Sequence, residues 1–168
     1  EDLGMPNATL KIELEQQKEF YSNGQDKLTW LLAANKGGSF NDIKKAASGG
    51  ELSRIMLAVK SILATYSNLP TIIFDEIDTG VSGDIAQKMA GILQKMGKNM
   101  QVIAITHLPQ IAGKGDRHFK IYKEDAATST ITNIRELQGE ARIEELAMML
   151  GGKNISESAV AHAKALLN

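Results

Sequence analysis

Cysteine is absent from the 168 residues of this sequence, and neither basic nor acidic residues are in clear excess. Without thiols the chain can form neither a disulfide framework nor a thiolate metal site, which fits a reducing compartment. The 19 basic and 20 acidic residues give a net charge of -1, whereas a stand-alone nucleic-acid-binding domain usually has a basic excess or a basic stripe. We therefore expect any DNA contact by this chain to be weak or confined to a small patch.

Long apolar runs are also lacking. No run approaches the roughly 18 residues of a membrane span, and no charged-then-apolar signal segment opens the chain. We therefore expect no membrane association. Because the sequence begins with Glu1 rather than with methionine, we expect it to be a piece of a longer protein.

The residues that are present are typical of one globular domain, spanning 1–168. Apolar residues make up 43% of the chain and charged residues 23%, which is close to the average for folded proteins. A chain of this length can bury a core without support from disulfides or metals.

Hydrophobic spacing predicts alternating strands and helices. Strands are expected over 8–14 and 28–32, as a hairpin around a turn at 24–26, over the apolar runs 71–74 and 101–106, and near 119–122 and 131–137. Helices are expected over 48–66, 83–96, 140–150 and 156–167. The apolar runs suit strands buried on both faces. This order indicates an α/β domain with a largely parallel central sheet, flanking helices and an N-terminal β-hairpin.

The first motif with chemical meaning is Ser48-Gly49-Gly50-Glu51 at a predicted helix start. Two glycines expose backbone N–H groups where the helix dipole favours an anion, so this segment can bind a phosphate. The alternative is structural, because Ser followed three residues later by Glu is a capping box.

The second motif is the pair Asp75-Glu76, directly after an apolar strand. In open α/β sheets, ligands bind beyond the carboxyl ends of the strands. Adjacent carboxylates point in different directions, so one can hold a hydrated Mg²⁺ and the other can orient or deprotonate a water. The alternative is an acidic turn that leaves a strand.

Two further motifs follow the same logic. His107 ends the next apolar strand, where an imidazole can hydrogen-bond to a phosphate or to an attacked water, although a histidine there is often structural. Asp78 opens the loop 78–83, whose alternative role is to cap the following helix.

Together the motifs occur in the order of the second half of an ABC ATPase: signature, Walker B, D-loop and H-switch. Within that superfamily, the chain resembles the RecN family of bacterial DNA repair proteins, which are SMC-like. The resemblance is carried by 47–54, 74–83 and 106–110, and it extends to 5–8, to 149–152 and to His162-Ala163. Ala47 and Glu51 flank the signature where wider ABC proteins often have Leu and Gln, which favours RecN over membrane transporters.

The resemblance implies catalytic and metal-binding roles for three residues. Glu76 is implied to be the catalytic glutamate that polarises the attacking water. Asp75 is implied to act on Mg²⁺ through water, and His107 to sense the γ-phosphate of ATP.

The resemblance also implies an ATP-binding group. Ser48, Gly49, Gly50 and Glu51 would form the signature that contacts ATP held by the opposite subunit. Asp78 is implied to be the D-loop residue that couples the two sites.

A Walker A loop, Gly followed by four residues and Gly-Lys-Ser/Thr, is absent from the sequence. The resemblance places this loop in an N-terminal half, beyond a long coiled coil. The implied partners are that half, a second head in a homodimer, and DNA in the full-length protein. We expect the chain alone to bind ATP poorly and not to hydrolyse it, and the whole protein to be cytoplasmic and nucleoid-associated in bacteria.

Three alternatives remain open at this point. The chain can belong to another SMC-like or Rad50-like head, or it can be a non-catalytic docking domain with the ABC shape. The retained Glu76 argues against the docking domain, because an inert relative has no need of it. A metal-dependent hydrolase built on Asp75, Glu76 and Asp78 ranks last, because the three histidines show no metal-site spacing.

Overall fold

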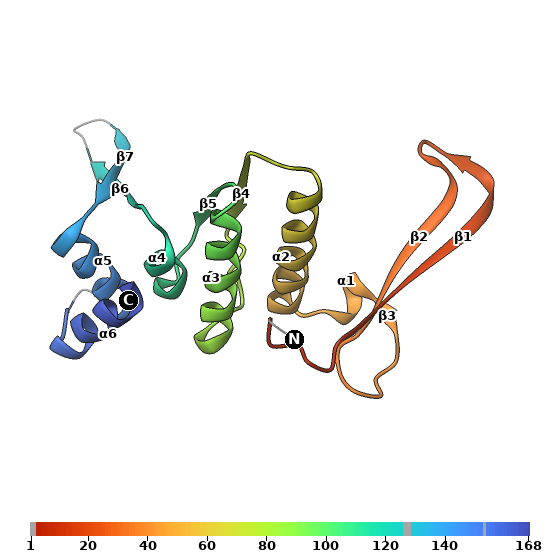
Figure 1. The fold of residues 1–168 in the computed structure, drawn as a ribbon, viewed down its shortest axis with the longest axis horizontal. Helices are drawn as coiled ribbons and strands as arrows, with labels where there is room; N and C mark the ends of the chain where they lie inside the picture. The colour runs from red at the N-terminus through yellow and green to blue at the C-terminus, as the bar shows by residue number, and fades with distance from the viewer. Residues whose placement is uncertain (1–2, 126–128, 153) are drawn as a thin grey trace.

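A long β-hairpin extends away from the rest of the molecule at one end (Figure 1). The computed structural model describes residues 3–125, 129–152 and 154–168, and in it β1 (Thr9–Tyr21) runs antiparallel to β2 (Gly24–Ala33). The predicted hairpin is confirmed, but its turn lies at 22–23, and Gly24 already begins β2. The short strand β3 (Asn41–Asp42) pairs with β2, and helix α1 (Ile43–Ala46) follows it.

The central part of the molecule is a parallel pair of strands with two helices. Helix α2 (Gly49–Tyr66) leads to β4 (Thr71–Asp75), and α3 (Gly83–Gly97) connects β4 to β5 (Gln101–Ile105). In Figure 1 the two helices lie next to each other in the central part of the molecule. The core between them includes Leu57, Phe74 and Met89, which are almost fully buried. Predicted helices 48–66 and 83–96 are thereby confirmed.

The other face of β4 and β5 has no cover among the described residues. Ile73, Ile103 and Ile105 point away from the core and keep 59%, 42% and 43% of their surface exposed. The prediction that both strands are buried on both faces is therefore wrong for the described residues. Alternate side chains of a strand point to opposite faces, and the helices of this chain cover only the face that carries Phe74.

The C-terminal part combines a second hairpin with three helices. These elements are α4 (Pro109–Lys114), β6 (His118–Asp125), β7 (Thr130–Leu137), α5 (Gly139–Gly151) and α6 (Glu157–Leu167). A small second core holds α5 and α6 together, with Leu146 and Ala163 fully buried. Gly152 ends α5 with φ 76°, and Ser156 caps α6 by accepting a bond from the Ala159 amide, so both predicted helix ends are confirmed.

The central sheet is less parallel than the sequence indicates. The strands of the described residues form separate sheets β1-β2-β3, β4-β5 and β6-β7, of which only β4-β5 is parallel. Parallel neighbours need a long crossover connection, and the connection through α3 joins β4 to β5 in this way. Beyond β5 the chain makes the short α4 and then a hairpin that pairs with itself. Among the described residues no helix has the length and apolar character needed to cross a membrane.

Candidate functional site

The predicted site residues lie at the C-terminal ends of β4 and β5 and at the N-terminus of α2. Asp75 is the last residue of β4, and the Glu76 amide donates to the Ile105 carbonyl over 3.1 Å. This bond keeps the chain beside β5 for one residue beyond β4. The segments after the two strands, which carry Glu76 and His107, are therefore held next to each other.

Ser48 and Glu51 form a complete capping box at the start of α2. The Ser48 amide and hydroxyl each donate to Glu51 Oε2 over 2.8 Å, and the Glu51 amide donates to Ser48 Oγ over 3.4 Å. These bonds from Ser48, followed by the nearby Arg54 charge, lower the pKa of Glu51. The structural interpretation of this motif is confirmed. The Ser48 hydroxyl must rotate away from Glu51 before it can donate to a phosphate.

The two signature glycines have different surroundings. A Cβ at Gly50 would overlap the carbonyl oxygen of Gly80, and a Cβ at Gly80 would lie 3.1 Å from the Gly50 nitrogen. A Cβ at Gly49 would meet nothing within 4 Å. Gly50 is thus required by the packing of α2 against the 78–83 loop. The fold itself sets no such requirement at Gly49, which faces open space.

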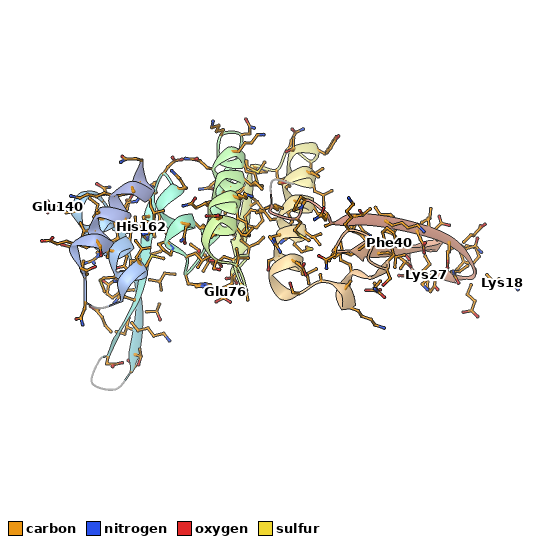
Figure 2. The ribbon with its side chains drawn as sticks, turned by 90° about the horizontal axis from the view of Figure 1, so that it is seen from below. Lys18, Lys27, Phe40, Glu76, Glu140 and His162 are labelled. Atoms are coloured by element: carbon orange, nitrogen blue, oxygen red, sulfur yellow. The ribbon has the colours of Figure 1, made fainter. Side chains whose placement is uncertain are left out.

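Glu76 is exposed and has an unusual backbone. Its φ of 47° lies in the left-handed region, which residues other than glycine seldom adopt. The Thr79 amide and hydroxyl both donate to the Glu76 carbonyl, over 3.2 and 2.9 Å. Strained residues of this kind cluster at functional sites. Figure 2 shows Glu76 at the rim of the central part of the molecule, where solvent and a ligand can reach it.

Asp75 and Glu76 border a shallow depression of about 250 Å³ beside α2. Its lining combines apolar residues with one cation and two carboxylates. It consists of Leu52, Ser53, Met56, Lys60, Phe74, Asp75, Glu76 and Ile77. The Lys60 ammonium lies 5.8 Å from the centre of the Phe74 ring. An exposed carboxylate at a strand end suits Mg²⁺, which binds to one or two carboxylates and keeps several waters.

The described residues contain no group of three His, Asp or Glu side chains placed to share an ion. Asp75 and Glu76 are exposed, whereas the Asp78 side chain is fully buried. Asp75 and Glu76 are thus the carboxylates that an ion could reach at this strand end, whereas Asp78 is closed off from it.

The Asp78 side chain is buried and is not part of the molecular surface. Its side chain has no exposed area, and its Oδ2 accepts a hydrogen bond from the Thr106 hydroxyl. The same oxygen lies 3.6 Å from His107 Nδ1, while the His107 side chain is 66% exposed. The structure thus brings Asp78 and His107 together, and it separates the Asp78 carboxylate from solvent.

Thr106 and Arg54 also belong to this region, although their contacts were not predicted from the sequence. Arg54 Nε donates to the Gly50 carbonyl over 3.1 Å, and Nη1 donates to the Leu3 and Gly4 carbonyls over 3.0 and 3.3 Å. Arg54 therefore joins the signature helix to the N-terminal segment. Its place one turn after Gly50 was the only signal in the sequence.

Comparison with known sequences gives a consistent result. No family model matches the chain. It is 44% identical to the DNA repair protein RecN of Vibrio cholerae over 99% of this chain and 30% of that protein. It is 41% identical to RecN of Halalkalibacterium halodurans over 92% of this chain and 27% of that protein. The chain thus spans less than a third of the length of these curated relatives.

Solved structures of SMC proteins have a similar fold. The SMC head of Pyrococcus yayanosii, with a coiled coil and joint, superposes with a TM-score of 0.68 at 20% identity, over 86% of this chain and 26% of that one. A structure from work on ATP-driven dimerization and DNA-stimulated activation of SMC ATPases gives 0.65 at 20% identity, over 91% and 87%. These similarities show that the fold is that of one lobe of an SMC ATPase head.

Proposed function

We propose that this chain, which belongs to the RecN family of DNA repair proteins, forms the C-terminal half of an ATP-hydrolysing head. Nearly all of the chain is related to one segment of the RecN proteins. The observation that carries the proposal is the grouping of Asp75, Glu76 and His107 at the joined ends of β4 and β5. Ligands bind at this edge of open α/β sheets. Another SMC-like head would use the same residues, but the RecN relatives match at far higher identity than the SMC structures do.

Each of the three side chains has a role that its position allows. Glu76, exposed at the rim, would orient and polarise the attacking water. Asp75 would hold Mg²⁺ through water, and the ion would neutralise phosphate charge. His107, also exposed, would sense the γ-phosphate through the water that attacks it. Phosphoryl transfer depends mainly on such positioning and charge stabilisation.

The start of α2 would bind the ATP held by a second head. The helix N-terminus offers backbone N–H groups and the positive end of the dipole. Gly49 leaves open space in front of these groups. Ser48 would add its hydroxyl after leaving Glu51, and Gly50 would hold this surface against the loop that follows Asp78. We propose a head homodimer on this basis.

The phosphate-binding loop must come from elsewhere in the protein. The sequence has no Walker A motif, and the apolar face of Ile73, Ile103 and Ile105 has no cover in the described residues. Strand β5 pairs only with β4 there, so its other edge can accept another strand. We propose that an N-terminal half docks on this face and edge, and completes the site.

The wider role would be ATP-dependent DNA repair in the bacterial cytoplasm. DNA would bind mainly to other parts of the full-length protein, because this chain has a net charge of only -1 and no basic excess.

ATP hydrolysis tests the proposal directly. We expect no turnover by the chain alone and turnover after mixing with the N-terminal half. Glu76→Gln should abolish that turnover, whereas Glu140→Gln, on α5 at the far end of the molecule (Figure 2), should leave it unchanged. Turnover by the chain alone would contradict the division of the site between two halves.

A non-catalytic docking domain is the remaining alternative. It predicts that the halves assemble, as measured by sedimentation, while the assembled head fails to hydrolyse ATP. The presence of Glu76 in a strained, exposed conformation speaks against it, because a docking surface gains nothing from that conformation.

A further inference from the structure

We propose that Asp78 is a positioning residue that sets the orientation and tautomer of His107, and that its carboxylate does not contact ATP. The proposal rests on the function given above for His107. It concerns the segment after β4, which carries Asp78, and the segment after β5, which carries Thr106 and His107.

One oxygen of Asp78 connects the two segments. Asp78 Oδ2 accepts the hydrogen of the Thr106 hydroxyl and lies 3.6 Å from His107 Nδ1. The Thr106 hydroxyl in turn accepts a hydrogen bond from the Leu108 amide over 3.0 Å. Thr106 is thus fixed on both sides, and the backbone that carries His107 is fixed with it.

The burial of Asp78 needs an explanation that capping does not give. The side chain is fully buried, and its second oxygen, Oδ1, has no hydrogen-bond partner among the described residues. A buried carboxylate with an unpaired oxygen is unfavourable by itself. Ser82, not Asp78, is the N-cap residue of α3, so Asp78 is not needed there. What Asp78 does reach is Thr106 and His107.

The geometry divides the two ring nitrogens of His107 between different tasks. Nδ1 faces the carboxylate, which favours a proton on Nδ1 because the partner of one nitrogen sets the tautomer of the ring. Nε2 lies on the other side of a ring that is 66% exposed, where its lone pair is free to accept a hydrogen bond from a water. The 3.6 Å separation exceeds a hydrogen bond, but such catalytic contacts often shorten only when the ligand is bound.

A double-mutant cycle in the assembled head tests whether Asp78 acts on ATP hydrolysis through His107. Asp78→Asn should lower kcat for ATP hydrolysis about tenfold to a hundredfold, as loss of an orienting carboxylate commonly does, and change KM less than about twofold. In a His107→Ala background, Asp78→Asn should have no further effect on kcat. The proposal would be overturned if the double variant lost kcat by the product of the two single losses. It would also be overturned if His107→Ala kept full activity.

A conservative exchange distinguishes the hydrogen bond from mere packing. Thr106→Ser keeps the hydroxyl and should keep most of the turnover, whereas Thr106→Val keeps the shape and should behave like Asp78→Asn. Equal loss in both Thr106 variants would mean that the region only needs to be packed.

Nitrogen NMR of the assembled head gives a reading that does not depend on turnover. We expect neutral His107 to carry its proton on Nδ1, and Asp78→Asn to raise the fraction protonated on Nε2. The His107 signal is assigned by its loss in His107→Ala, with His118 and His162 as references. A native His107 protonated mainly on Nε2 would overturn the proposal, whether or not the head hydrolyses ATP. Absent turnover with the expected tautomer would count against the proposed function alone.

Discussion

At the residue scale, Glu76 combines an exposed carboxylate with a backbone conformation that favours glycine. The left-handed region places the Cβ of other residues close to their own carbonyl oxygen. The two Thr79 bonds to the Glu76 carbonyl, together with the Glu76 amide bond to Ile105, hold the residue there. The chain thus keeps a destabilising residue at a position where glycine would fold more easily, which is expected only if the carboxylate is useful.

Replacing Glu76 by Gly should therefore stabilise the chain. We expect Glu76→Gly to raise the free energy of unfolding by about 0.5–1 kcal/mol, because removal of left-handed strain exceeds the entropic disadvantage of glycine. Glu76→Gln keeps the strain and should leave stability unchanged. Asn68→Gly is a matched control, since Asn68 has φ 48° but asparagine tolerates it better. Urea unfolding measures all three, and a less stable Glu76→Gly variant would show that no strain is released.

At the element scale, local sequence patterns predicted the helices and strands but not the contacts between them. The capping box at Ser48 and the spacing of apolar residues in α2 and α3 are local signals that the structure confirms. The alternation in β1 and β2 correctly predicted the two strands. The half-burial expected for the first strand is wrong for the described residues, because Leu10, Ile12 and Leu14 stay 41%, 54% and 64% exposed. Helices α1 and α4 are too short to show a period, and they were missed. The Gly50–Gly80 contact and the Arg54 bonds to Leu3 and Gly4 join residues far apart in sequence, so no local pattern contains them.

The two signature glycines should respond differently to the same substitution. Gly50→Ala should destabilise the chain by about 1–3 kcal/mol, because the added methyl group overlaps the Gly80 carbonyl and backbone must move. Gly49→Ala adds its methyl group in open space and should change stability by less than about 1 kcal/mol. Urea unfolding compares them. In the assembled head, Gly49→Ala should nevertheless reduce ATP turnover, since the methyl group would stand where the phosphate approaches; unchanged turnover would remove Gly49 from the binding surface.

At the scale of the whole molecule, the open apolar surface is what the sequence could not reveal. The runs 71–74 and 101–106 are apolar throughout, which is typical of strands covered on both faces. That pattern describes the strands in their complete surroundings, whereas this chain covers only the Phe74 face. The same reason explains why a largely parallel sheet was expected but only β4 and β5 form one. Asp78 is a related case, because its burial depends on the segment that follows β5.

The open face gives a direct test of how the proposed head assembles. Ile73 is 59% exposed in the centre of β4 and pairs with Ile103 across the strands. Ile73→Glu should leave the isolated chain as stable as before within about 0.5 kcal/mol, since the position faces solvent.

Binding of the N-terminal half should respond much more strongly. If that half covers the face, Ile73→Glu places an unpaired charge in an apolar interface and should weaken association by about 3 kcal/mol, or more than about a hundredfold. Phe20→Glu is a matched control, because Phe20 is apolar, 80% exposed and lies on the distant β1–β2 hairpin. Calorimetric titration measures both variants against the unchanged chain. Undiminished binding by Ile73→Glu would mean that the halves meet elsewhere, and the exposed face of β4 and β5 would then need a different occupant.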